Sequence, residues 1–277
     1  MAGLRLRPGF FTSALAICAL VFSSITLADS PVLDRIVDKG VLRVGMSLQQ
    51  PPFNMRDSDG ADFGYDVDLA RALADAMQVS LEIVEIPFAE LLPALRNGKV
   101  DTVISGLTIT PERSRSVSFV GPYTLSGKSI LTTQRIKAVV QQPTDFNSAE
   151  ISIVALKDST SAAYVQNKLP DALFDAIDNY NQGIEMLLTG KVDAMVADIP
   201  VLKLVLLRYP EAQLGMIEPP LSIEPLGIAI DRDARQFDNL LRNYLRSFDQ
   251  GGLLPRLRHK WFEDNSWVER LPAQPSK

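Results

Sequence analysis

The run between residues 103 and 113 combines groups that could bind an anion. It starts with apolar residues that favour a short strand, and it continues as a loop that opens at Gly106 and carries the hydroxyl of Thr108. Thr110 is a good N-cap and precedes a proline that suits the first helical position, so we expect a helix to begin there. Its free N–H groups would attract a carboxylate, and the planar guanidinium of Arg113 matches a carboxylate bidentately. The alternative is a capped surface helix with a solvated arginine.

A second group of polar residues offers further donors and a carboxylate. The hydroxyls of Thr160 and Ser161 come directly before a helix expected from Ala162, which places another helix N-terminus beside hydroxyl groups. Asp198 ends a short apolar strand and could hold a cation, and its alternative role is a helix cap before Pro200.

Short apolar strands alternate with amphipathic helices along the chain. The expected strands are 41–46, 81–86, 100–104, 151–156 and 226–230. The clearest helix has apolar residues on one face from Phe237 to Phe248. This alternation predicts an α/β fold with a parallel, doubly wound sheet. In such sheets ligands lie at the carboxyl ends of the strands, which would bring the loops after Met46, Ile86 and Ile104 to one edge.

An internal repeat indicates two similar halves. The tetrapeptide Gly98-Lys99-Val100-Asp101 recurs as Gly190-Lys191-Val192-Asp193. Each copy follows an amphipathic helix and precedes a short apolar strand that ends in a polar loop. We therefore expect two lobes, with the second beginning near Gln134 and the strand at 226–230 returning to the first.

A family resemblance supports this organisation. Ser-Gly-Leu-Thr-Ile-Thr-Pro-Glu-Arg at 105–113 is followed by Val-Ser-Phe at 117–119 and Gly-Pro-Tyr at 121–123. The pattern resembles the signature of periplasmic amino-acid-binding proteins, the receptors of ABC importers in extracellular solute-binding family 3, and the resemblance continues through most of the chain after Leu33. It implies a periplasmic-binding-protein-like fold of two doubly wound lobes joined by a two-crossover hinge. The expected boundaries are 33–134 plus 225–270 for the first lobe, 135–224 for the second and 271–277 for a tail.

The resemblance also implies roles for the polar residues. Arg113 and Thr108 would hold the α-carboxylate of a bound amino acid, and Asp198 would hold its ammonium group. The remaining residues of the implied ligand-binding set are Gly106, Phe88, Thr160, Ser161, Lys157 and Ser47. Phe88 falls where the family stacks an aromatic ring against the ligand, and its alternative role is core packing.

Several positions depart from the family pattern. Gln50 stands where many relatives have an aromatic residue, so the apolar clamp on the ligand side chain would be one-sided. Ser47 stands where several relatives place an acidic or polar contact, and Lys157 aligns with a residue that contacts the ligand side chain in some members. Ser159 replaces a common glycine. These departures favour a polar ligand, such as an acidic or amide amino acid.

Residues 1–28 are typical of a secretory signal peptide, with Arg5 and Arg7 before an apolar stretch and small residues near Ala28. A retained N-terminal anchor is the alternative, and lipidation of Cys18 is disfavoured by the bulky Ile17. Cleavage removes two of the 28 basic residues, none of the 33 acidic ones and the only cysteine, which leaves a formal charge of −7. This balance argues against nucleic acid as a partner. With the resemblance, we expect a periplasmic monomer that binds an amino acid, contacts an ABC permease and carries neither cofactor nor metal.

An enzyme is the alternative class. Cyclohexadienyl dehydratases share the expected fold, and the Gly-Leu-Leu near the carboxyl end resembles theirs. Their elimination of water and carbon dioxide needs a positioned proton donor. In those enzymes a glutamate follows the threonine-containing turn of the second lobe, whereas here the equivalent stretch, Thr160 to Ala163, contains no acid.

Overall fold

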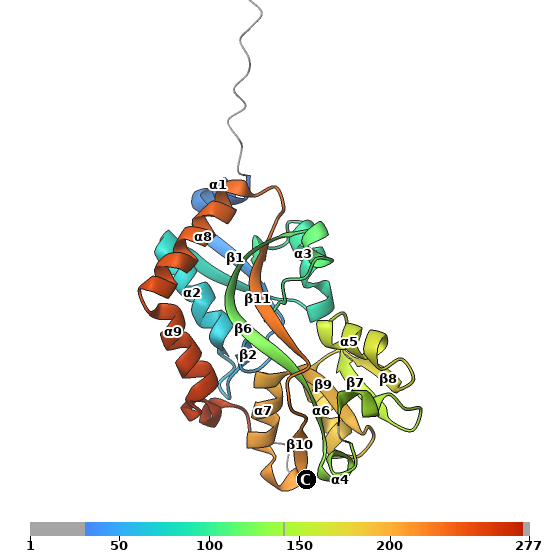
Figure 1. Ribbon diagram of the computed structural model, residues 1–277. Coiled ribbons are helices and arrows are strands. Elements are labelled where there is room, and N and C mark those ends of the chain that lie inside the picture. Colours follow the sequence, from blue (N-terminus) through green and yellow to red (C-terminus); the bar gives the residue numbers. More distant parts are fainter. Residues whose placement is uncertain (1–30, 141, 274–277) are drawn as a thin grey trace, which may run out of the picture.

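The computed structural model describes residues 31–140 and 142–273. The chain forms two α/β lobes, one above the other in Figure 1. The predicted signal peptide at 1–28 lies outside the described residues, as do residues 274–277 of the predicted tail.

The strands of the main sheet are β1 (Val41–Met46), β4 (Ser80–Glu85), β5 (Thr102–Val103), β6 (Ser118–Thr133), β7 (Ser152–Leu156), β8 (Leu173–Ile177), β9 (Ala194–Asp198), β10 (Leu214–Met216) and β11 (Ser222–Ile230). They are hydrogen-bonded in the order β4-β1-β5-β11-β6-β9-β7-β8, with β10 beside β6. We call the part around β4, β1 and β5 the first lobe and the part around β9, β7 and β8 the second lobe. Neighbouring strands are parallel within each of these groups, as the sequence predicts. A separate small sheet pairs β2 (Met55–Arg56) with β3 (Asp62–Phe63).

The helices are α1 (Pro31–Lys39), α2 (Tyr65–Met77), α3 (Leu91–Arg96), α4 (Gln134–Lys137), α5 (Thr160–Lys168), α6 (Tyr180–Leu188), α7 (Ile199–Arg208), α8 (Arg235–Gln250) and α9 (Leu253–Arg258). The expected helix from Phe237 to Phe248 is α8, and it buries one face through Phe237, Leu241 and Leu245. Burying each such side chain contributes about 1.5–3 kcal/mol, so this face anchors the helix. Within the described parts of the chain, no helix is both long enough and apolar enough to cross a membrane.

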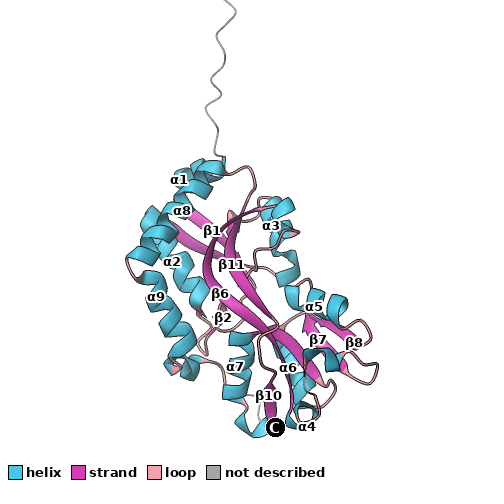
Figure 2. Ribbon diagram, in the orientation of Figure 1, coloured by secondary structure: helices cyan, strands magenta, loops and turns pink. Residues whose placement is uncertain are grey.

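Strands β6 and β11 run through both lobes and join them, as the long central strands in Figure 2 show. They pair antiparallel with each other from Ser118 with Ile230 to Lys128 with Ser222. Beyond Lys128, β6 pairs with β9 of the second lobe instead. The predicted two-crossover connection is thus confirmed, and hydrogen bonding across the two strands makes the sheet continuous.

Side chains cover both faces of the sheet in the first lobe. Leu42 and Val44 of β1 lie in the same buried cluster as Leu69 of α2 and Leu241 of α8. Gly45, the residue after Val44, faces the α3 side, where an added Cβ would lie 3.3 Å from Val103 and 3.5 Å from Leu91. This two-sided burial is what a doubly wound sheet requires.

The repeated Gly-Lys-Val-Asp has the same structural role in both lobes. In each copy the glycine has positive φ, +67° in the first and +70° in the second. Asp101 accepts the N–H of Arg43 at 2.8 Å, and Asp193 accepts the N–H of Ser152 at 2.9 Å. Each aspartate N–H also donates to the carbonyl of that same partner, at 3.0 Å in both copies. The repeat therefore ties the turn to the neighbouring parallel strand in both lobes.

Candidate ligand-binding cleft

A cavity of about 170 Å³ lies between the lobes. Its lining comprises Ser47, Gln49, Gln50, Pro87 and Phe88 from the first lobe and Leu156, Asp178, Asn179 and Tyr180 from the second. These residues lie at or just after the carboxyl ends of β1, β4, β7 and β8, which is where doubly wound sheets bind ligands. A wider depression of about 510 Å³ lies over α8 and α1, and no charged side chain is among the described residues that line it.

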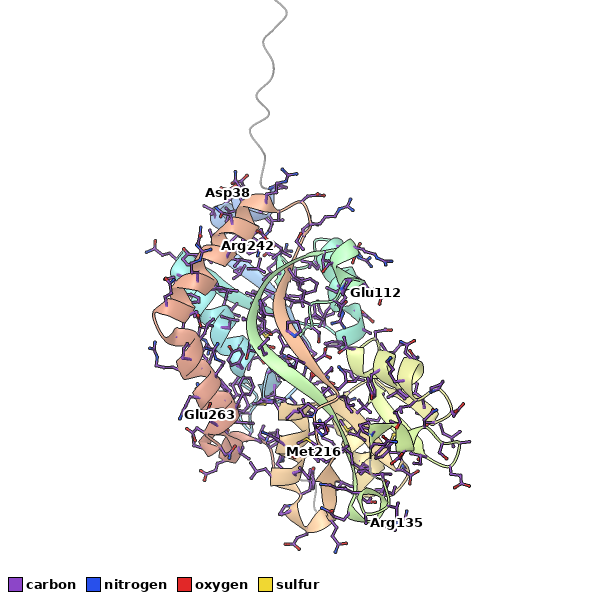
Figure 3. The ribbon with its side chains drawn as sticks, viewed as in Figure 1. Asp38, Glu112, Arg135, Met216, Arg242 and Glu263 are labelled. Atoms are coloured by element: carbon purple, nitrogen blue, oxygen red, sulfur yellow. The ribbon has the colours of Figure 1, made fainter. Side chains whose placement is uncertain are left out.

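The expected helix at Thr110 is a single 3-10 turn, Arg113–Arg115, and that prediction is wrong. The hydroxyl of Thr110 does accept the N–H of Arg113, at 3.2 Å, so the predicted cap contact forms. However, only Arg113–Arg115 are helical before β6 begins at Ser118. A turn this short has no appreciable macrodipole, and any carboxylate bound here would depend on the guanidinium. Glu112 lies at the surface, as Figure 3 shows.

The guanidinium of Arg113 is fixed by both lobes. Its Nη1 donates to the carbonyl of Thr108 at 2.9 Å, and its Nη2 donates to the carbonyl of Asp158 in the second lobe at 3.1 Å. Its carbon atom Cζ lies 5.9 Å from the ring centroid of Phe88. Burial lowers the pKa of Arg113, while the negative charge of Asp198 opposes that shift. The remaining guanidinium N–H groups could form charge-assisted hydrogen bonds to an anion.

Asp198 ends β9 and is buried. It stands at the N-cap position of α7, but its side chain makes no capping hydrogen bond, so the helix-cap alternative is wrong. The Nε2 group of Gln50 donates to its Oδ2 from the first lobe at 3.4 Å, a long contact. Burial raises the pKa of Asp198 to about 6, against the lowering effect of the charge on Lys128. The carboxylate is thus desolvated and weakly partnered.

A buried ion pair on the crossover strands was not predicted from the sequence. Lys128 of β6 donates through Nζ to Glu224 of β11 at 2.7 Å and to the hydroxyl of Thr160 at 3.0 Å. Ser222 donates to the same Glu224 oxygen at 2.6 Å. Burial would raise the pKa of Glu224, but hydrogen bonds from Lys128, Ser222 and Thr108 outweigh it and hold the pKa below its usual value. The pair is neutral overall, and it links the two crossover strands to the start of α5.

The start of α5 lies beside this ion pair. Ser159 is the N-cap, and its hydroxyl accepts the N–H of Ala162 at 3.1 Å. The N–H groups of Thr160 and Ser161 occupy first-turn positions, which have no carbonyl partner inside a helix. The predicted second helix N-terminus is therefore present, and its amides belong to an ordered, nine-residue helix.

Three other predicted residues differ in their surroundings. Phe88 and Ser47 line the cavity, and the Ser47 hydroxyl donates to Oδ1 of Asn54 at 3.0 Å. Lys157 has an exposed side chain and is absent from the residues that line the cavity. Of the two predicted contacts to a ligand side chain, the structure thus places Ser47 at the cavity and Lys157 outside it.

Gly106 packs closely against Gln50, which lines the cavity. Its φ is +53°, and an added Cβ would lie 2.5 Å from Nε2 of Gln50. Its N–H donates to Oδ2 of Asp66 at 2.8 Å, so a ligand could contact only its carbonyl or Cα. Asp66 also accepts hydrogen bonds from Nδ2 of Asn54 at 2.9 Å and from the hydroxyl of Tyr123 at 2.8 Å. Burial raises the pKa of Asp66 to about 6 despite these donors.

We expect Asp66→Ala to destabilise the fold. The substitution leaves three buried donors without their acceptor, and a single such loss costs about 1–3 kcal/mol. Urea unfolding at pH 7.5 measures the change. Asp75→Ala is the matched control, because Asp75 is on the same helix and exposed. Equal unfolding free energies for the two variants would contradict the supporting role of Asp66.

Known proteins resemble this chain in sequence and in fold. The chain is 29% identical to ABC transporter arginine-binding protein 1 of Escherichia coli, across 80% of this chain and 90% of the relative. It is 27% identical to cyclohexadienyl dehydratase of Pseudomonas aeruginosa, across 90% and 93%. The crystal structure of the ancestral amino acid-binding protein AncCDT-1, a precursor of cyclohexadienyl dehydratase, superimposes with a TM-score of 0.78 at 33% identity, across 83% and 99%. Residues 42–264 match the bacterial extracellular solute-binding proteins, family 3, and the chain belongs to this family.

Proposed function

We propose that the protein captures a free L-amino acid between its lobes and delivers it to an ABC permease, without chemical conversion. One observation carries this proposal: two unlike charges, Arg113 of the first lobe and Asp198 of the second, lie near enough to attract each other. Neither is among the residues that line the cavity, but each contacts a residue that does, Phe88 and Gln50 respectively. Neither takes part in an ion pair within the described residues. An α-carboxylate and an ammonium group would complete both.

The ligand-binding set follows from this placement. Arg113, with the first-turn amides of Thr160 and Ser161, would hold the α-carboxylate, while Asp198 would hold the ammonium group. The hydroxyl of Thr108 is hydrogen-bonded to Glu224, so we assign Thr108 its role through its carbonyl, which positions Arg113. Phe88 would pack against the ligand from the first lobe.

Hinge closure would accompany binding, because both lobes contribute to the site. We place the lobe division at 33–134 plus 225–270 and at 135–224, with β6 and β11 as the hinge strands. Membership of an extracellular binding-protein family supports a periplasmic location reached through a cleaved signal peptide at 1–28. A monomer suits this mode of action, because one chain supplies both charged ends of the site.

A thermal-shift panel of the twenty amino acids tests the proposal. A ligand at a hundredfold excess over its Kd should raise the unfolding free energy by about 2.7 kcal/mol. We expect a clear increase in Tm with at least one L-amino acid and none with its α-amide or N-acetyl derivative, since each derivative removes one of the two charges. No shift with any amino acid would contradict the proposal.

The similarity to cyclohexadienyl dehydratase supports a lyase as the second candidate. Asp198 offers a protonatable carboxyl in the cleft, because its pKa lies near 6. Glu224 is unsuited to donate a proton, since Lys128 keeps its pKa low. Incubation with prephenate or arogenate, followed by detection of the aromatic product, separates the candidates. Turnover without an amino-acid-dependent shift would favour the enzyme.

A further inference from the structure

The cavity wall that would surround a ligand's side chain is rich in hydrogen-bond acceptors. Among the described residues that line it, Asp178 is the one charged side chain, and there is no lysine or arginine. Lys157 follows the lining residue Leu156, but its side chain is exposed and outside the lining. The lining therefore contains one negative charge, on the exposed residue Asp178, and no positive charge.

Gln50 adds an acceptor without a partner. The residue is only 2% exposed, so its amide is removed from water. Its Nε2 donates to Asp198, which fixes the orientation of the amide group. The other amide atom, Oε1, is buried and has no hydrogen-bond partner within the described residues. A buried carbonyl oxygen without a donor is unfavourable, so this atom indicates where a ligand donor would be bound.

We propose that the ligand is an amino acid whose side chain ends in N–H donors, with a cationic end favoured over a carboxamide. This inference rests on the proposed function. The ligand's donors would meet Oε1 of Gln50 and the carboxylate of Asp178, while Phe88 covers the apolar stem. An acidic side chain would face Asp178 and an unpartnered carbonyl oxygen with no cation to balance it. The sequence led us to expect a polar ligand, such as an acidic or amide amino acid. The acceptors in the cavity wall argue against an acidic side chain and favour one with N–H donors.

Gln50 is then the residue that determines specificity. A glutamine here supplies a fixed acceptor, whereas an aromatic ring would only stack on the ligand. Because its two amide atoms have different partners, the same side chain would contact Asp198 through nitrogen and the ligand's side chain through oxygen.

The test compares ligands that share a backbone and differ at the side-chain end. Isothermal titration calorimetry at pH 7.5 measures Kd for lysine and norleucine, which differ in the terminal ammonium group, and for glutamine and glutamate. We expect lysine to bind about tenfold or more tightly than norleucine, and glutamine about tenfold or more tightly than glutamate, since each missing donor leaves the buried acceptor unpaired.

Two variants test which residues cause the preference for lysine over norleucine. Gln50→Leu should reduce the lysine-to-norleucine affinity ratio several-fold. Its loss of the contact to Asp198 affects both ligands equally, so that loss cancels in the ratio. Asp178→Asn should reduce the same ratio, while Asp175→Asn should not, because Asp175 is also exposed but lies in β8, outside the cavity lining. Urea unfolding without ligand confirms that each variant is folded.

The outcomes separate this inference from the proposed function. Equal affinity for lysine and norleucine, or tighter binding of glutamate than of glutamine, would overturn the side-chain assignment and leave amino-acid binding intact. An affinity ratio that Gln50→Leu and Asp178→Asn both leave unchanged would also overturn it. Failure of every amino acid to bind would reject the proposed function itself, and this inference with it.

Discussion

Replacing Arg113 by alanine is expected to weaken amino-acid binding by roughly thirty- to several-thousand-fold. The guanidinium is held between the lobes by the carbonyls of Thr108 and Asp158. In a closed cleft its removal leaves the ligand's α-carboxylate desolvated and unpaired, which costs on the order of 2–5 kcal/mol. At about 1.4 kcal/mol per tenfold change, this cost gives the stated loss in Kd. Titration calorimetry with the ligand found in the thermal-shift panel measures it.

Two further variants test whether geometry or charge matters at this position. Arg113→Lys should recover little affinity, because an ammonium group cannot reproduce two parallel donors or the contacts to both carbonyls. Arg115→Ala is the matched control, since Arg115 belongs to the same 3-10 turn and is exposed. If Arg113→Ala bound the ligand as tightly as Arg115→Ala, the carboxylate site would have to lie elsewhere in the cleft.

Elements with strong local periodicity could be predicted from the sequence. α8 follows directly from apolar residues at helical spacing between Phe237 and Phe248, and β1 has the predicted bounds of 41–46. The long strand β6 was missed, because Gly121, Pro122 and Gly127 interrupt its apolar pattern. What makes this segment a strand is its pairing with β11, about a hundred residues later in the chain, and local patterns do not contain that information.

The α-helix that we predicted at Thr110 does not form, for a related reason. The hydroxyl of Thr110 does accept the N–H of Arg113, but the turn begins only at Arg113, with Glu112 at its N-cap position. The segment ends at Ser118 because β6 must begin there to pair with Ile230. A helix-start signal predicts initiation, whereas the length that follows is set by the rest of the fold.

The candidate site was partly accessible from the sequence. Arg113 and Asp198 follow or end recognisable strands, so both could be predicted from the sequence as ligand-binding residues. Lys128 and Glu224 could not, because they meet only through the diagonal register of two distant strands. The sequence signal for this ion pair was a single charged residue inside an otherwise apolar strand. Gln50 was noticed as a departure from the family pattern, but its contact with Asp198 depends on how the lobes meet.

Ligand binding should weaken as the pH falls through the pKa of Asp198. Burial raises that pKa from its ordinary value of 3.8 to about 6, and only the ionised carboxylate pairs with an ammonium group. Bound ligand lowers the pKa, so protons compete with the ligand below pH 6, and Kd should rise by up to about tenfold per pH unit there. Titration calorimetry from pH 8 to pH 4.5 measures this trend.

Asp198 affects the stability of the free protein in the opposite direction: as the pH falls, its contribution to stability increases. Because the folded-state pKa exceeds the unfolded value, Asp198 favours folding more as the pH falls from above 6 towards 4. Loss of affinity in this window therefore cannot be attributed to unfolding driven by Asp198. Urea unfolding of the free protein over the same pH range checks this separation.

Asp198→Asn completes the test. It removes the charge that would balance the ligand's ammonium group, so binding at pH 7.5 should fall by roughly thirty-fold or more. Its Kd should also become nearly independent of pH between 5 and 7. Asp66, whose pKa also lies near 6, holds the loop at Gly106 and would account for any slope that remains. A wild-type Kd that stays constant from pH 7.5 to pH 5, or full affinity in Asp198→Asn, would show that another group binds the ammonium.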